Sequence, residues 1–254
     1  MKINKYFSIK KNLIYLMIFL SIFICKVDVF ANPKDNSDKI PIFCVDTEEK
    51  KIALTFDLNW CEEDYLYPIL DVLDKYNVKS TFFVMGKWIN FPEGNKVKFL
   101  EVVKRGHEIG NHSYQHPNFL QINRKQIEKE IVNTEKIIYD ITGKRSDYFR
   151  FPGGGFTSEG VKIVNENNLK AIQWSKDSLD WKNTSADFEY NRVMKNIQAG
   201  DIILFHNNGK YTATNLQRII PKLQAEGYKF VTIGELVYKN DFFVNENGKQ
   251  FKIN

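Results

Sequence analysis

Two histidines four positions apart are the first candidates for chemistry in this chain. In the stretch NHSYQH, His112 and His116 are spaced so that both imidazoles lie on one side of a helical turn or tight loop. This spacing suits a borderline metal such as zinc. An isolated H-x-x-x-H is more often a pair of surface histidines, and it is the company of other polar residues that favours the metal site here.

A carboxylate and an arginine stand at the ends of two further apolar runs. TFDLNW places Asp57 after the run KIALTF and follows it with Leu58, not with a second acid. FRFPGGGF joins Arg150 to Pro152 and three glycines, which let the backbone approach a ligand and expose N–H groups. Taken alone, Arg150 would equally suit a surface ion pair in a plain loop.

Two more motifs combine polar and apolar groups. DSLDW puts Asp180 directly before Trp181, an arrangement that can brace a histidine and offer a wall to a sugar ring, or that can be a solvated turn beside a core tryptophan. LFHNNG leaves His206 at the end of an apolar run, with Leu204 on the same side two residues earlier. A satisfied core histidine is the other interpretation of His206.

The elements that carry these motifs alternate along the chain. Strand-like runs are expected at 51–56, 80–85, 107–111, 148–151, 170–175, 201–205 and 229–233. Helical apolar spacing lies between them, at 62–76, 123–143 and 212–227. Alternating strands and helices predict parallel β/α units, and seven of them suit a barrel.

The polar residues then share one location. They follow or end successive strands: Asp57, His112 and His116, Arg150, Asp177 and Asp180, and His206. Because the carboxyl ends of barrel strands form one rim, where barrel enzymes place their chemistry, these side chains are expected to converge. The fourth histidine, His107, begins its strand and is expected to be a core residue facing the opposite rim.

The first 31 residues differ in composition from the rest of the 254-residue chain. Lysines precede the apolar run 13–25, which is shorter than the roughly 20 residues that a membrane-spanning helix needs. Small residues at 29–31 then favour a cleaved secretory signal peptide, with an uncleaved membrane anchor as the alternative. We therefore expect an extracytoplasmic protein, secreted or associated with the membrane or cell wall. Residues 32–49 are polar and are expected to be a linker.

The charge balance and the cysteine content of the chain limit the class of protein to which it can belong. Residues 1–31 hold five lysines and one aspartate, so their removal would leave 31 basic and 30 acidic residues and no electrostatic basis for nucleic-acid binding. Cys44 and Cys61 would be the remaining cysteines, either paired or unrelated thiols.

The tail 239–254 contains a candidate hairpin turn at Asn247-Gly248. We expect a monomer.

In order, these motifs resemble the NodB-homology polysaccharide deacetylases, carbohydrate esterase family 4. The resemblance covers the domain expected at 50–238, and HEIGNHSYQHP and EGYKFVTIGEL look most like its sporulation-associated Gram-positive branch. It implies an α/β fold, a distorted (β/α)7 barrel. It also implies metal-dependent removal of N-acetyl groups from cell-wall amino sugars, in peptidoglycan or chitin-like glycans.

The resemblance implies a catalytic role for four residues. Asp57 matches the general base, and Arg150 matches the residue that orients it. His206 matches the general acid, and Asp180 matches the carboxylate that tunes this histidine.

It also implies the groups that hold metal and substrate. His112 and His116 match two ligands of a divalent metal, for which Zn²⁺ is the expected ion. Trp181 and Leu204 match walls of the substrate and acetyl pocket, and Gly153 would supply a backbone N–H.

The departure from the family pattern lies at Leu58, where the family usually has a third metal ligand, an aspartate. Asn59 or water would have to fill that position. A catalytically silent glycan-binding protein is therefore the alternative to an enzyme. The residues leave open whether the substrate is N-acetylglucosamine, N-acetylmuramic acid or an O-acetylated sugar.

Overall fold

The computed structural model describes residues 34–90 and 94–253. The expected leader, residues 1–31, lies outside the described residues. None of the helices in the described ranges is both long enough and apolar enough to cross a membrane.

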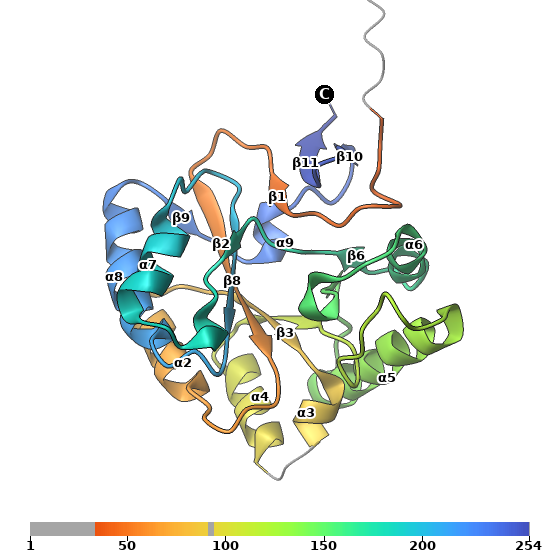
Figure 1. Cartoon of the computed structure of the whole chain (residues 1–254), viewed down its shortest axis with the longest axis horizontal. Coiled ribbons are helices and arrows are strands. Elements are labelled where there is room, and N and C mark those ends of the chain that lie inside the picture. The colour runs from red at the N-terminus through yellow and green to blue at the C-terminus, as the bar shows by residue number, and fades with distance from the viewer. Residues whose placement is uncertain (1–33, 91–93, 254) are drawn as a thin grey trace, which may run out of the picture. The chain divides into compact units, whose positions relative to one another are not determined.

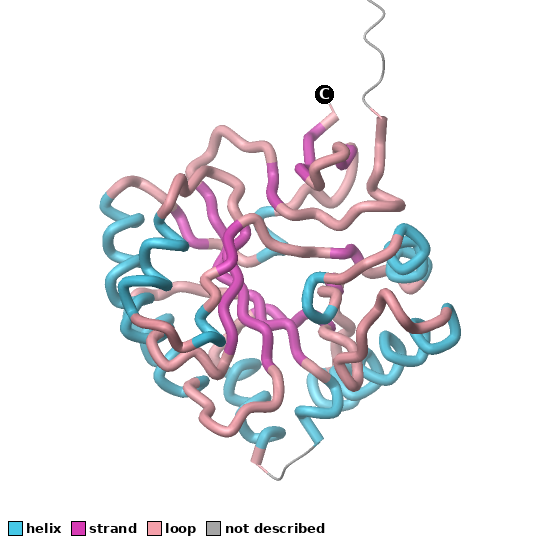
Figure 2. The backbone as a smooth tube through the Cα atoms, viewed as in Figure 1, coloured by secondary structure: helices cyan, strands magenta, loops and turns pink. Residues whose placement is uncertain are grey.

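A curled, parallel sheet forms the centre of the fold (Figures 1 and 2). Its neighbouring strands run in the order β6-β5-β4-β3-β2-β8-β7, and β9 pairs with β2. The strands are β2 (Lys51–Leu58), β3 (Thr81–Val84), β4 (Glu108–Asn111), β5 (Tyr148–Phe149), β6 (Lys170–Ala171), β7 (Lys176–Asp177), β8 (Ile202–His206) and β9 (Lys229–Phe230). The predicted distorted (β/α)7 barrel is confirmed as a half-barrel.

Most of the helices cover the outside of this sheet, and the last, short one packs against the opposite face of β2 (Figure 1). They are α2 (Leu66–Lys75), α3 (Gly86–Asn90), α4 (Asn95–Lys104), α5 (Arg124–Thr142), α6 (Ser158–Glu166), α7 (Ala186–Met194), α8 (Thr212–Ala225) and α9 (Ile233–Leu236), with 3₁₀ turns η1 (Pro152–Gly154) and η2 (Asp180–Lys182). The three helices expected from apolar spacing are α2, α5 and α8. Helix α5 starts at a capping box between Asn123 and Gln126, and ends at Gly143, whose φ of 69° a glycine adopts without strain.

The main core lies between the sheet and its helices. Phe56 of β2 stacks between Phe82 and Phe205 of the neighbouring strands, at ring-centroid distances of 4.8 and 5.7 Å. Leu58 belongs to the same cluster, with the apolar faces of α2 and α8, and is fully buried. Since side chains alternate along a strand, Asp57 and Leu58 face opposite sides of β2.

Of the expected strand 170–175, only Lys170–Ala171 is a strand, β6. Strand β7 begins after it, at Lys176, and the segment around Ile42 pairs with the backbone between the two. The Ile42 N–H donates to the carbonyl of Ala171, and the Gln173 N–H donates to the carbonyl of Ile42, at 2.8 and 2.7 Å. The sheet is therefore not continuous from β6 to β7, because an earlier stretch of the chain takes up the backbone groups at that point.

The same contacts correct the expected linker at 32–49. Its described part packs on the folded unit, with β1 (Cys44–Val45) pairing in parallel with β11 (Lys249–Lys252). Strand β10 (Phe242–Val244) pairs antiparallel with β11, so the hairpin expected at Asn247-Gly248 is confirmed. Cys44 and Cys61 are free thiols rather than a disulfide.

Candidate active site

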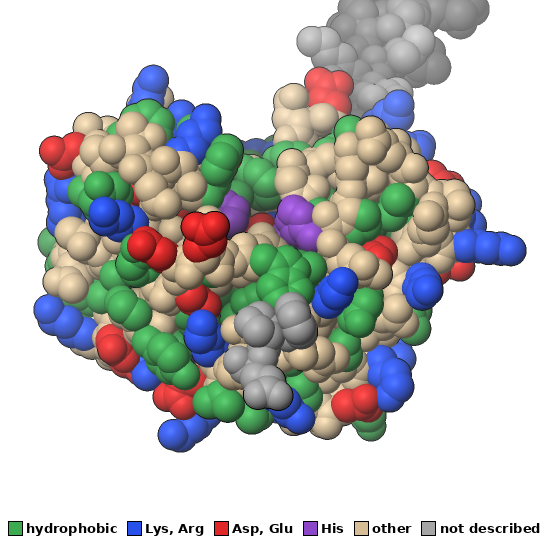
Figure 3. All heavy atoms as spheres, turned by 60° about the horizontal axis from the view of Figure 1, so that its bottom comes forward, with side chains coloured by type: hydrophobic (Ala, Val, Ile, Leu, Met, Phe, Trp, Pro, Cys, Tyr) green, Lys and Arg blue, Asp and Glu red, His purple; other side chains and the backbone are tan. Residues whose placement is uncertain are grey.

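A pocket of about 350 Å³ opens where β2 and β8 end. Figure 3 shows this hollow with histidine side chains on both sides of it. Its lining is Asp57, Asn59, Trp60, His116, Gly153, Trp174, Asp177, Trp181, Leu204, His206 and Asn208. Six of the nine expected site residues thus share one pocket, and the other three, His112, Arg150 and Asp180, are buried in contact with them.

Asp57 is held by a buried arginine. The Nη1 of Arg150 lies 2.9 Å from Oδ1 of Asp57, and its Nη2 donates to the carbonyl of Gln173 at 3.2 Å. The guanidinium also stacks 4.0 Å from the centre of the Phe83 ring. A Cβ at Gly110 would lie only 2.5 Å from that ring, so a glycine is needed there. Burial alone would raise the pKa of the Asp57 carboxyl, but His112, Arg150 and His206 together hold this pKa below its usual value.

His112 presents one free ring nitrogen. Its Nδ1 lies 3.0 Å from the carbonyl oxygen of Arg150, which fixes a neutral ring with the proton on Nδ1. Its Nε2 is buried without a hydrogen-bond partner among the described residues and lies 3.4 Å from Oδ2 of Asp57. Burial lowers the pKa of His112 to about 4, so the Nε2 lone pair is available at neutral pH.

His116 joins His112 through a strained loop. The two ring centroids are 5.0 Å apart. His116 has a φ of 57°, a left-handed conformation uncommon for histidine, and its backbone N–H donates to Oγ of Ser113 at 3.0 Å. The loop is held from α5, where Oε2 of Glu130 accepts the N–H groups of Tyr114 and Gln115 at 2.8 and 2.7 Å.

The two imidazoles fit a divalent metal, because they supply a buried, unpartnered nitrogen beside a second ring. In the described ranges 34–90 and 94–253, however, no group of three or more His, Cys, Asp or Glu is arranged to hold one. Leu58 contributes nothing to the site, since its side chain is in the core. Among the described His, Cys, Asp and Glu residues, the candidate donors at this point are therefore the two imidazole nitrogens.

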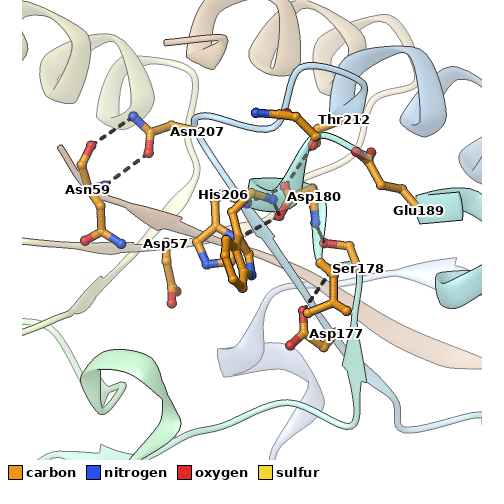
Figure 4. A network of polar contacts seen from close by, with 12 residues as sticks. Asp57, Asn59, Asp177, Ser178, Asp180, Glu189, His206, Asn207 and Thr212 are labelled. Atoms are coloured by element: carbon orange, nitrogen blue, oxygen red, sulfur yellow. Dashed lines mark hydrogen bonds and ion pairs between the residues drawn. The ribbon is translucent and has the colours of Figure 1, made fainter. Parts of the chain in front are cut away.

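His206 and Asp180 form a hydrogen-bonded pair on the other side of the pocket (Figure 4). Oδ1 of Asp180 lies 2.7 Å from Nδ1 of His206, and Oδ2 accepts the His206 backbone N–H at 2.7 Å and the Thr212 hydroxyl at 2.8 Å. A Cβ at Gly209 would lie 2.6 Å from that Oδ2. Burial would lower the pKa of His206, but the Asp180 charge and hydrogen bond outweigh it and raise this pKa above its usual value.

Sequence reasoning missed several residues of the pocket. Trp60 stands within the quoted motif TFDLNW and Asn208 within LFHNNG, so both carried a positional signal. Trp174 had none, because only the break between β6 and β7 turns it toward the pocket. His107 is buried away from this site, as expected, and its Nδ1 accepts the Ser80 N–H at 3.3 Å.

The fold is a curled β/α half-barrel whose pocket brings together a carboxylate held by an arginine, a histidine held by a carboxylate, and two further imidazoles. The family model described as polysaccharide deacetylase matches residues 45–172. The chain belongs to the polysaccharide deacetylase family, whose members are generally metal-dependent.

Named relatives are similar over most of the chain. A peptidoglycan-N-acetylglucosamine deacetylase of Bacillus cereus is 37% identical over 72% of this chain and 66% of its own length. The enzyme PgdA of Listeria monocytogenes, with the same description, is 35% identical over 79% of this chain and 42% of its own length. PdaA of Bacillus subtilis, a peptidoglycan-N-acetylmuramic acid deacetylase, is 33% identical over 77% of this chain and 74% of its own length. The chain spans less than two thirds of the length of the first two.

Solved structures give the same fold. A CE4 family pseudoenzyme from Bacillus anthracis is 35% identical, with a TM-score of 0.72 over 77% of this chain and 68% of its own. A mutant of that pseudoenzyme, described as having restored enzymatic activity, is 36% identical with the same TM-score and covers 77% of this chain and 70% of its own.

Proposed function

We propose that the protein hydrolyses the N-acetyl groups of amino sugars in a cell-wall glycan, releasing acetate and leaving a free amine. The observation that carries the proposal is the placement of an arginine-held carboxylate and a carboxylate-held histidine across one pocket. A protein that only binds glycan has no need of two separately buried partners, Arg150 and Asp180, for these two groups.

Asp57 is the general base in this proposal. Its lowered pKa keeps it ionised at neutral pH, and Arg150 holds one carboxylate oxygen so that the other faces the pocket. Asp57 takes the proton of the water whose oxygen forms a bond to the acetamide carbon. The backbone N–H of Gly153, which has a φ of 61° and open space around it, is placed to donate to the carbonyl oxygen as negative charge develops there.

His206 is the general acid. The amine is a poor leaving group until it is protonated, and the raised pKa of His206 favours the protonated ring that can supply this proton. As the C–N bond breaks, His206 gives that proton to the departing nitrogen. Asp180 stabilises the cationic ring and fixes its orientation through Nδ1.

A divalent metal, for which zinc is the proposed ion, would be held by His112 and His116. When bound, it would polarise the amide carbonyl and lower the pKa of a water to about 7. Because His112 is neutral and its Nδ1 contacts the Arg150 carbonyl, the lone pair of its Nε2 is available to bind the metal. Proposed roles of Trp181 and Leu204 are the outer wall of the sugar site and the floor of the acetyl pocket.

The test is acetate release from peptidoglycan and from N-acetylglucosamine oligomers, measured with the zinc content of the same preparation. We expect release that depends on added zinc and is lost in His206→Ala. Muropeptides analysed by mass spectrometry then show which of the two peptidoglycan sugars lost its acetyl group. Wild-type protein that contains zinc and binds these glycans, but releases no acetate, would overturn the proposal.

One observation favours a second candidate function, a glycan-binding protein without catalysis. Leu58 is fully buried in the core, and the donor set lacks a third ligand. The similarity to the Bacillus anthracis pseudoenzyme supports this candidate. It predicts glycan binding that is unaffected by zinc or by chelators, which the zinc-dependent release above would exclude.

A further inference from the structure

Two exposed tryptophans border the pocket. Trp60, in the loop after β2, is 39% exposed, and Trp181, in η2, is 48% exposed. We propose that Trp60 is a second sugar-binding platform, so that the glycan chain is held on both sides of the reacting sugar. The inference rests on the proposed function, because it concerns how the same pocket takes its substrate.

Strand order places the two rings on opposite flanks of His206. Strand β8, which ends at His206, lies between β2 and β7 in the sheet. Trp60 follows β2, and Trp181 follows β7. A sugar whose acetamide reaches His206 therefore has one aromatic ring toward each neighbouring strand, and its neighbours in a linear chain would lie over them.

The loop that carries Trp60 is fixed by one buried side chain (Figure 4). Oδ1 of Asn207 accepts the N–H of Asn59 at 3.1 Å, and Nδ2 of Asn207 donates to the Asn59 carbonyl at 3.2 Å and to Sγ of Cys61 at 3.2 Å. The N–H of Tyr65 donates to the Asn207 carbonyl at 2.7 Å. Since residues on both sides of Trp60 are tied to Asn207, little conformational entropy is left to lose when a ligand covers the ring.

The chemistry of the lining fits a neutral, hydroxylated chain. Three of the four tryptophans in the sequence, Trp60, Trp174 and Trp181, line this pocket, and flat aromatic faces suit the apolar C–H face of a sugar ring. The amides of Asn59 and Asn208 can meet hydroxyl groups. Within the described part of the chain, no lysine or arginine lines the pocket, and its basic side chains are His116 and His206.

The test compares chain lengths. Acetate release from N-acetylglucosamine hexamers and trimers is measured with wild-type protein, Trp60→Ala and Trp60→Phe, together with Tyr139→Ala, an exposed aromatic on α5, as the matched control. We expect Trp60→Ala to raise the hexamer KM about tenfold, with a smaller change in kcat, so that the preference for hexamer over trimer falls. Trp60→Phe should keep most of that preference, and Tyr139→Ala should behave as wild type.

Two outcomes would overturn the inference. One is an unchanged hexamer KM in Trp60→Ala, and the other is an equal loss on hexamer and trimer, which indicates a general disturbance of the site. If no variant releases acetate, calorimetric binding of the hexamer to the same four proteins replaces the kinetic readout. A tenfold weaker binding of hexamer to Trp60→Ala alone would then support the platform while the proposed catalysis fails.

Discussion

Asp57 and His206 occupy directly paired positions on the neighbouring parallel strands β2 and β8. Each is the last or next-to-last residue of its strand, so both side chains reach the same pocket although 149 positions separate them in the chain. Each has its own buried partner, Arg150 for the carboxylate and Asp180 for the histidine. These partners shift the two pKa values in opposite directions, lowering that of Asp57 and raising that of His206, which suits the proposed base and acid of one reaction.

Replacing Asp57 by asparagine tests the base. The amide has the same shape and still offers an oxygen to Arg150, but it takes up no proton. We expect kcat to fall about 10²- to 10⁴-fold, and the melting temperature to fall as well, because the buried Arg150 loses its counter-charge. Steady-state acetate release and thermal melts of the same preparations check this. Near wild-type turnover in Asp57→Asn would remove the residue from the mechanism.

Asp180→Asn tests the proposed role of His206 through the pH dependence of activity. The pKa of His206 is raised in the folded protein, so the ring stays cationic above the ordinary histidine value of 6.5, and activity should fall only as pH rises through this higher pKa. Without the carboxylate, burial dominates, and the alkaline limb of kcat/KM against pH should move to lower pH by about one unit or more. An alkaline limb at the same pH in wild type and variant would assign that limb to another group.

Leu58 is the position that separates this chain from the family pattern. Leu58→Asp puts a carboxylate into the core beside the pocket, and we expect the metal-free variant to lose about 2–5 kcal/mol of unfolding free energy, as Leu58→Ala should. Because position 58 faces the core and not the pocket, we expect zinc to raise the melting temperature of Leu58→Asp no more than that of Leu58→Ala. A larger zinc shift in Leu58→Asp would show that a carboxylate at position 58 reaches the two imidazoles.

His107 gives a stability test away from the pocket. Burial lowers its pKa to about 4, below the ordinary 6.5, so the unfolded chain binds more protons between these values. Stability should therefore fall as pH drops from about 6.5 to 4, by up to about 3 kcal/mol from this group. Urea unfolding with a chelator present, at several pH values, should show a flatter pH dependence in His107→Gln. An identical dependence would contradict the lowered pKa.

Gly110→Ala tests the support beneath Arg150. The added Cβ would lie 2.5 Å from the Phe83 ring on which the guanidinium stacks. Because both neighbours are packed, we expect a loss of about 1–3 kcal/mol in stability, and a lower kcat as Arg150 and Asp57 shift. Calorimetry and acetate release measure the two effects. Wild-type stability and wild-type kcat in Gly110→Ala would mean that the Phe83 ring moves aside at no cost in free energy.

Part of this architecture was accessible from local pattern. The long, regular helices α2, α5 and α8 show apolar spacing on one face, and the strands β2, β3, β4 and β8 are apolar runs between them, so the parallel sheet could be predicted from them. The short strands did not follow. Strands β6 and β7 are separate because the segment around Ile42, from far earlier in the chain, bonds to the backbone between them. The packed segment 34–49 looked like a linker because the partner of its strand β1 lies at the other end of the sequence.

By itself, the sequence determined which side chains end the strands, and hence that Asp57, His112, His116, Arg150, Asp180 and His206 would gather at one rim. Only the tertiary structure decided their electrostatic state and their surroundings. It buried Leu58 in the core, left Nε2 of His112 without a partner in the described chain, and fixed the Trp60 loop on Asn207. The reason is physical: position along a strand is a local property, whereas burial, pKa and hydrogen-bond partners depend on groups that only folding brings together.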